Sequence, residues 1–353
     1  MDQFFKPDQI VVVGGGLAGC CAALALSRHA DVTLVDDGRR QSASIAGAGL
    51  VNPLLGRQAK RVWRADEALA AFDALIDDVG AHDVVSRRPV LRPAGDERQA
   101  QRFRDAADRS PHLGTWLDAA ESARRYPGIP APLGSLLVAG SAVRIDLLLD
   151  RIADVLASRG VKVLSDHRVG EWHEEPAYVE ALLTDGSILR GPRLVLCLGA
   201  SALDRPEFRG LNLHAVKGQT VNVVLPKDVA DWPHVSGKAY LAVFDDRIMI
   251  GSTWEHVFDD DRPTDAATAD ILRRASATTP AIKHADIRSV RAGIRVTVPR
   301  SYLPMVGPLP GAERTWIFTG LGSKGLLMAP LIANALFGFM SGQTSIPAEI
   351  AVR

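Results

Sequence analysis

Residues 10–19 read IVVVGGGLAG, and a second apolar run with an acidic end, VTLVD, follows at 32–36. The β-branched residues before the glycines are typical of a buried strand, and the Ala- and Leu-rich stretch after them is typical of a buried helix. Strand, glycine turn, helix, strand and acid in this order form a dinucleotide-binding unit. The opening of the chain therefore predicts a Rossmann-like domain.

Each glycine of the G-x-G-x-x-G pattern has a physical role in that unit. Gly14 permits the tight turn, Gly16 lets the backbone approach a pyrophosphate, and Gly19 lets the helix pack closely on the strand. The helix N-terminus then faces the negative charge of the phosphates. Asp36, 22 residues after Gly14, is expected to accept hydrogen bonds from ribose hydroxyls. A glycine-rich structural turn is the alternative, and the unit alone does not separate NAD from FAD.

Length and charge set further limits. The 353 residues suggest two domains or one large one, and 41 basic residues balance 41 acidic ones. This balance argues against a protein that coats nucleic acid or binds a membrane through basic charge. The sequence has no apolar run of about 18 residues and no secretory leader at its start, and its cysteines are Cys20, Cys21 and Cys197. We expect a cytoplasmic protein without structural disulfides or a metal site.

In the rest of the chain, the strand pattern changes once from a parallel to an antiparallel type. Apolar strands at 161–164 and 194–199 continue the parallel pattern, whereas 216–255 alternates like an antiparallel sheet and includes TVNVVL at 220–225. Helices are expected at 65–79, 145–156, 265–279 and 325–341, and a hairpin at 178–189. The predicted fold class is α/β (α+β overall), a nucleotide-binding domain interleaved with an antiparallel-sheet substrate domain. The expected segments are 1–55, 141–210 and 291–353 for the nucleotide domain, and 56–140 and 211–290 for the substrate or cap domain.

Several short motifs occur in a fixed order along nearly the whole chain. They are Lys217-Gly218-Gln219, Gly251-Ser252-Thr253, Arg291-Ala-Gly-Ile-Arg295, Leu303-Pro-Met-Val-Gly307 and Gly320–Pro330. With the first glycine unit, this ordered set resembles the D-amino-acid-oxidase-like flavoprotein family, which includes glycine and sarcosine oxidases. The motifs look most like the oxidoreductase half of the bifunctional enzyme that matures 5-methylaminomethyl-2-thiouridine in tRNA.

The resemblance implies FAD as cofactor, with its adenine half on the first unit and its isoalloxazine edge at the glycine loop 320–325. The absence of any cysteine after Cys197 points to noncovalent binding. Besides Gly14, Gly16, Gly19 and Asp36, the expected cofactor-binding residues are Leu17, Ala18, Ser44, Ala48, Gly49, Leu50, Val169, Gly199, Ala200, Gly320, Gly322, Ser323, Lys324, Gly325 and Leu326.

Four residues are candidates for the chemistry. Arg295 stands where glycine-oxidase-like relatives place a carboxylate-binding arginine, and a structural salt bridge is the alternative. Arg291 points to the same side of the strand and is held as a supporting candidate. Tyr240 lies where relatives carry a substrate-facing hydroxyl, with buried sheet packing the favoured alternative. Lys324 is expected either to stabilise reduced flavin or to be solvated.

The leading hypothesis is oxidation of the C–N bond of a small amine or amino acid by hydride transfer to flavin N5, with O2 as acceptor. The resulting imine hydrolyses to a carbonyl compound and an amine. A quinone or an electron carrier remains open as acceptor. The alternatives are a tRNA wobble-uridine side-chain oxidoreductase, which the neutral charge opposes, and a flavin-bound protein without amine turnover.

Overall fold

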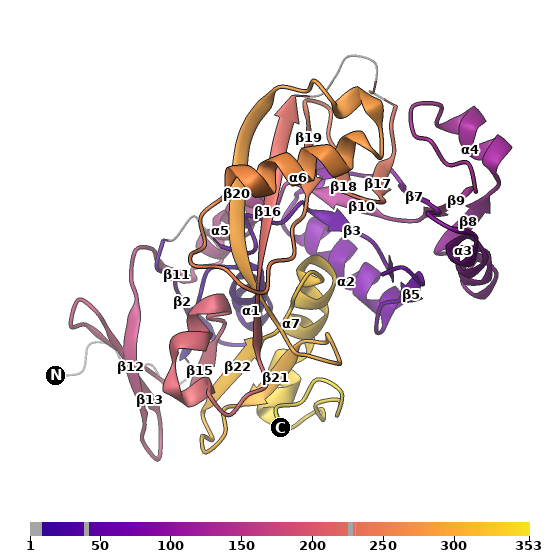
Figure 1. Cartoon of the computed structure of the whole chain (residues 1–353). Coiled ribbons are helices and arrows are strands. Elements are labelled where there is room, and N and C mark those ends of the chain that lie inside the picture. The colour runs from indigo at the N-terminus through magenta and orange to yellow at the C-terminus, as the bar shows by residue number, and fades with distance from the viewer. Residues whose placement is uncertain (1–8, 39–41, 225–228, 230) are drawn as a thin grey trace.

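The protein is described by a computed structural model that covers residues 9–38, 42–224, 229 and 231–353 (Figure 1). Residues 1–8, where no secretory leader is expected, lie outside this description. The same holds for residue 225, the last of the strand expected at 220–225. Among the described residues, no helix is both long and apolar enough to cross a membrane.

The dinucleotide-binding unit forms the centre of a six-stranded sheet with the order β11-β2-β1-β15-β22-β21. Neighbouring strands are parallel except for β21, which is antiparallel to β22. The strands are β1 (Gln9–Val13), β2 (Asp31–Val35), β11 (Lys162–Leu164), β15 (Arg193–Leu196), β21 (Met305–Pro308) and β22 (Thr315–Thr319). All residues of β1 and β22 are buried, as expected for strands covered on both faces.

Four helices pack around this sheet: α1 (Leu17–Leu26), α2 (Ala65–Asp78), α5 (Ile145–Ser158) and α7 (Gly325–Ser341). Helix α1 contacts both α5 and α7, and α2 packs against α7. Helix α7 ends at Gly342, whose φ of 74° is the left-handed conformation that terminates helices. The helices expected at 65–79, 145–156 and 325–341 are confirmed.

The second layer is an eight-stranded sheet with the order β20-β16-β19-β18-β17-β7-β9-β8. Its neighbours are antiparallel except for β17 and β7. The strands are β7 (Val90–Pro93), β8 (Gly114–Leu117), β9 (Ser135–Val138), β16 (His214–Val224), β17 (His234–Ser236), β18 (Tyr240–Val243), β19 (Arg247–Gly251) and β20 (Ile287–Thr297). Helix α6 (Asp265–Ser276) packs on β16 and β19, so the expected antiparallel sheet and helix are confirmed.

Smaller elements complete the fold. Strands β3 (Leu50–Val51), β10 (Ser141–Val143) and β6 (Val85–Ser86) form one sheet, and β4 (Leu54–Leu55) pairs with β5 (Lys60–Arg61). Strands β12 (Val169–Glu174), β13 (Val179–Leu183) and β14 (Ile188–Gly191) project from the lower part of the molecule as drawn and include the expected hairpin (Figure 1). Helices α3 (Glu97–Arg109) and α4 (Ala119–Arg125) lie at the far end of the eight-stranded sheet, and short 3-10 turns cover 82–84, 199–204, 206–208 and 280–282.

One expected domain boundary falls inside an element. Position 291 lies in the middle of β20, which pairs with β16 from Ile287 to Thr297. The eight-stranded sheet therefore continues to Thr297, and β20 links it to the layer that contains α7. The remaining segment boundaries stay predictions.

His234 offers a test of the packing between β17 and its neighbours. The ring is fully buried; its Nδ1 accepts from the Val243 amide at 3.0 Å, and its Nε2 lies 3.1 Å from the Ser86 carbonyl. Burial lowers the pKa of His234 to about 4. Because the unfolded chain binds a proton near pH 6.5 and the folded chain does not, the free energy of unfolding should fall as pH drops from about 6.5 to 4.

The expected loss is about 3 kcal/mol, since each pKa unit corresponds to about 1.4 kcal/mol. Urea unfolding at a series of pH values measures it in the wild type and in His234→Gln, which cannot titrate. The variant should show a shallower loss over this interval, and equal pH slopes in the two proteins would contradict the assignment.

Candidate active site

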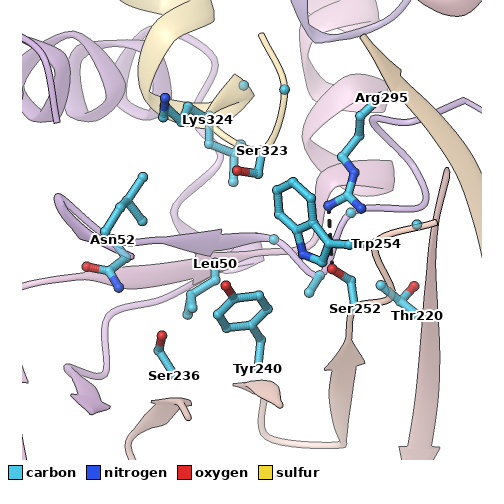
Figure 2. A pocket seen from close by; sticks show the side chains of 18 of the residues that line it. Leu50, Asn52, Thr220, Ser236, Tyr240, Ser252, Trp254, Arg295, Ser323 and Lys324 are labelled. Carbon is cyan, nitrogen blue, oxygen red and sulfur yellow. Dashed lines mark hydrogen bonds between the residues drawn. The ribbon is translucent and has the colours of Figure 1, made fainter. Parts of the chain in front are cut away.

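A cavity of 840 Å³ lies where the two main layers meet. It is lined by the start of α1, the segment 43–50, the start of α7 and residues of strands β7, β16, β17, β18 and β20 of the eight-stranded sheet. Figure 2 shows Ser323 and Lys324 on one side of the cavity, with Tyr240 and Ser236 on the facing side. Sixteen of the predicted site residues line it: Gly16, Leu17, Ala18, Ser44, Ala48, Gly49, Leu50, Gly199, Tyr240, Arg295, Gly320, Gly322, Ser323, Lys324, Gly325 and Leu326.

The glycines before α1 have the geometry that the pattern predicts. Gly14 has a φ of 110°, and a Cβ atom there would lie 2.4 Å from the Cys197 carbonyl oxygen. A Cβ at Gly19 would lie 1.8 Å from the carbonyl oxygen of Gly14, so only glycine allows α1 to approach the strand this closely. A Cβ at Gly16 would meet only the Ser44 hydroxyl oxygen, at 3.2 Å, on the side that lines the cavity.

Asp36 is held by the same turn. Its Oδ1 accepts from the Gly15 amide at 3.0 Å, so the carboxylate orders the glycine turn before any ligand is present. The predicted cofactor residues outside the cavity lining are Gly14, Gly19, Asp36, Val169 and Ala200. Of these, Val169 begins β12 and its carbonyl accepts from Arg205 at 2.6 Å. The cofactor roles of all five stay predictions.

The second glycine loop brings another helix N-terminus to the cavity. Gly320 and Gly322 have φ values of 74° and 54°, and α7 begins at Gly325 beside the Leu17 side chain of α1. Two helix N-termini with unpaired amides thus face one space, an arrangement that stabilises anionic groups. A dinucleotide fits this donor set if its central pyrophosphate meets one helix N-terminus and its ring, which gains negative charge on reduction, meets the other.

Arg295 lies on β20 with its guanidinium over the Trp254 ring, 4.1 Å from the ring centroid (Figure 2). Its Nη2 donates to the Thr253 carbonyl at 2.7 Å, and its Nη1 lies 3.4 Å from the Ser252 hydroxyl. The buried Nε has no hydrogen-bond partner among the described residues, nor does the side chain form an ion pair with them. Burial lowers the pKa of Arg295 to about 10, against the opposing effects of Tyr240 and Glu255.

Arg291 has a different environment from the one hypothesised. Its Nη2 pairs with Asp146 at 3.0 Å and its Nη1 donates to the Ile45 carbonyl at 3.3 Å. The residue shares a strand face with Arg295, as predicted, yet it is absent from the cavity lining. These contacts fix β20 to α5 and to the small-residue loop, so the observed geometry matches a structural ion pair.

Tyr240 and Lys324 both line the cavity. The Tyr240 ring is 36% exposed instead of being buried in the sheet, which is the opposite of the favoured packing interpretation. The Lys324 ammonium donates to the Tyr302 carbonyl, and burial lowers the pKa of Lys324. The lysine is therefore neither fully solvated nor free of a partner, and its effect on flavin stays a prediction.

Several lining residues were not predicted as site residues from the sequence, among them Trp254, Ser252 and Arg92. Trp254 and Ser252 belong to the segment that contains the motif Gly251-Ser252-Thr253, and this adjacency was the available signal. Arg92 of β7 is 4% exposed, and no sequence pattern distinguishes it from the many other arginines between 80 and 140.

These features define a flavoprotein oxidoreductase, and comparison with known proteins confirms that class. Residues 9–337 match the family described as FAD dependent oxidoreductase, and the chain belongs to that family. Its cofactor is FAD, and it is an oxidoreductase enzyme. The hypothesis of a flavin-bound protein without enzyme activity is thereby disfavoured.

The chain is also similar to individual proteins over nearly its whole length. The chain is 29% identical to a glycine oxidase of Pseudomonas aeruginosa, over 96% of each chain. It is 24% identical to the tRNA 5-methylaminomethyl-2-thiouridine biosynthesis bifunctional protein of Idiomarina loihiensis, over 99% of this chain but 58% of that protein. The crystal structure of iminodiacetate oxidase from Chelativorans sp. superposes with a TM-score of 0.84 at 24% identity, over 97% of this chain and 98% of that one.

Gly16→Val tests the proposed phosphate cradle. Gly16 has a φ of −78°, which any residue can adopt, so the fold should survive, while the added side chain enters the cavity. We expect a folded protein that has lost FAD, measured by circular dichroism and by the flavin-to-protein absorbance ratio.

Gly19→Ala is the contrast variant, because its Cβ would collide with the Gly14 carbonyl and should prevent folding itself. A Gly16→Val protein that retains stoichiometric FAD would show that this turn does not hold the pyrophosphate.

Proposed function

We propose that this enzyme oxidises the C–N bond of a small amino acid whose carboxylate binds Arg295. The observation that supports this most strongly is the Arg295 guanidinium, which lines the cavity without an ion pair among the described residues. A planar fork of N–H donors fits a carboxylate in two-point contact. Glycine, the substrate in the name of the Pseudomonas aeruginosa relative, carries such a carboxylate next to its amine.

The bound FAD supplies the acceptor for a hydride from the carbon next to nitrogen, and O2 is the proposed final oxidant. Loss of that hydride from the neutral amine leaves an iminium ion, which takes up water and separates into a carbonyl compound and a protonated amine. The roles of the chain are to hold the carboxylate at Arg295 and to keep the guanidinium plane fixed against Trp254. Backbone amides at the start of α7 would stabilise the negative charge that FAD gains on reduction.

The substrate amine is proposed to lose its proton before it binds to the enzyme. Among the described residues that line the cavity, none is Asp, Glu or His, the usual general bases. The substrate amine is therefore proposed to bind in its neutral form, with its proton lost to water. The single experiment that tests the function is anaerobic bleaching of the flavin by glycine, sarcosine, proline and D-amino acids, followed by peroxide detection in air.

Rapid bleaching by at least one of these amino acids is the expected result. A flavin that dithionite reduces but none of the panel does would overturn the proposed function. The tRNA alternative stays a prediction, and binding of tRNA at increasing salt would test it.

Free FAD should be released when the protein is denatured. The three cysteines are buried; burial raises the pKa of Cys20 to about 12 and raises those of Cys21 and Cys197 further, so none is a reactive thiolate. Acid precipitation followed by chromatography of the supernatant measures the release. Flavin that stays with the precipitated polypeptide would contradict noncovalent binding.

Arg295→Lys should keep FAD but weaken the response to a carboxylate substrate. Lysine retains the charge and loses the planar two-point contact, which costs about 1.5–3 kcal/mol, or roughly 10- to 150-fold in half-saturation. Flavin bleaching against substrate concentration measures the effect.

Arg291→Lys is the matched control, because Arg291 lies on the same strand and pairs with Asp146 outside the cavity lining. It should leave half-saturation within about twofold. An unchanged half-saturation in Arg295→Lys with intact FAD would remove Arg295 as the carboxylate anchor.

A further inference from the structure

The cavity lining carries cations besides Arg295, the residue proposed to bind the substrate carboxylate. Five described lining residues are cationic, and none is Asp or Glu. Arg295 and Lys324 lie toward the glycine loop that begins α7. The other three, Arg57, Arg92 and Lys238, come from the segments expected to form the cap domain, and the part of the lining that they form is called here the second end of the cavity.

These three cations differ in how far they are neutralised. Arg57 pairs with Asp96 at 2.8 Å at the exposed rim. Arg92 is 4% exposed, and its guanidinium is 4.8 Å from the Phe103 ring centroid and donates only to the carbonyls of Leu54 and Gly56. Among the described residues, no carboxylate pairs with Arg92 or with Lys238, so both charges remain uncompensated.

A β-hairpin places Lys238 above this end of the cavity. Ser236 of β17 pairs with Tyr240 of β18, and the Gly237 amide donates to the Ala239 carbonyl at 3.1 Å, so Lys238 lies at the tip. Figure 2 shows the hydroxyl groups of Ser236 and Tyr240 directed into the cavity from these neighbouring strands. Tyr240, Arg92 and Arg295 all line the same cavity.

We propose that Ser236, Lys238 and Tyr240, above the buried charge of Arg92, bind a second anionic group of the substrate. This inference rests on the proposed function, since it places the first carboxylate at Arg295. The substrate class is then an amino acid with a second carboxylate, on its nitrogen substituent or on its side chain. Lys238 and the two hydroxyls supply the direct donors, while Arg92 keeps the local potential positive.

Two inert sulfur compounds test the subsite by binding alone. Methylthioacetate carries one carboxylate, and thiodiacetate adds a second at the other end of the same chain; neither has an amine to oxidise. Titration of the FAD-loaded protein, followed by the flavin absorbance change, gives both dissociation constants. We expect the wild type to bind the dianion more tightly, and Lys238→Gln to weaken the dianion about 5- to 30-fold but the monoanion less than twofold.

The controls separate the subsite from a general effect of charge. Lys238→Arg should restore most of the preference for thiodiacetate. Lys283→Gln removes one positive charge from an exposed position away from the cavity lining and should leave both constants unchanged. Equal weakening of both compounds in Lys238→Gln, or no preference for the dianion in the wild type, would overturn the proposal.

Turnover then distinguishes this inference from the proposed function. Iminodiacetate and sarcosine are the reactive counterparts on nitrogen, and aspartate and alanine are the counterparts on the side chain. Lys238→Gln should lower kcat/KM selectively for the dicarboxylate of whichever pair reacts. Binding selectivity without turnover of any amino acid would contradict the proposed function while supporting the subsite, and turnover with no Lys238 selectivity would do the reverse.

Discussion

The contact between α1 and the strand before it sets the position of everything around the cofactor site. The approach of Gly19 to the Gly14 carbonyl leaves no room for a side chain at Gly19, and the Cys197 carbonyl leaves none at Gly14. This contact fixes the direction of α1, whose N-terminal amides face the cavity, and α1 in turn packs along α7. The second helix N-terminus is therefore aligned by the first, and a cofactor that spans both meets two prepared anion sites. Glycine at position 19 thus determines more of the site than any polar residue does.

The proposed substrate-binding part of the cavity depends on the free-energy cost of burying a charge, whereas the cofactor-binding part depends on close backbone packing. Arg295 is partly withdrawn from water, and only carbonyl and hydroxyl oxygens and the Trp254 face compensate it. A guanidinium in this state binds a carboxylate more strongly than an exposed one would, because less water must be displaced. Gly218 on the neighbouring strand makes the arrangement possible, since a Cβ there would lie 2.4 Å from Nη2 of Arg295. The glycine in the motif Lys217-Gly218-Gln219 therefore leaves the space that the Arg295 guanidinium occupies.

The sequence predicts the parts of this structure that depend on local pattern. The glycine unit, the buried strands and the long apolar helices follow from periodicity, and the Arg291–Arg295 spacing follows from strand alternation. Pairings between distant segments do not follow in this way. Asp146, which neutralises Arg291, is 145 residues away, and the surroundings of Tyr240 depend on which strands border it. The segment boundary expected at 291 lies within β20, and the sequence pattern does not show this because β20 pairs with a strand about 70 residues earlier in the chain.

Strand β20 contacts the loop on the cofactor side of the cavity and also carries Arg295. Its Gly293 lies against the small-residue loop, where a Cβ would be 3.0 Å from Ala43, and Arg291 holds the same loop through Ile45. Arg295 on the same face enters the cavity two residues further along. The loop 42–49 is the wall between the first glycine unit and the antiparallel sheet, so one strand both supports the cofactor side and carries the carboxylate anchor. A shift of β20 by one residue would turn Arg291, Gly293 and Arg295 to the other face, and the site would then lose its loop contact and its cation together.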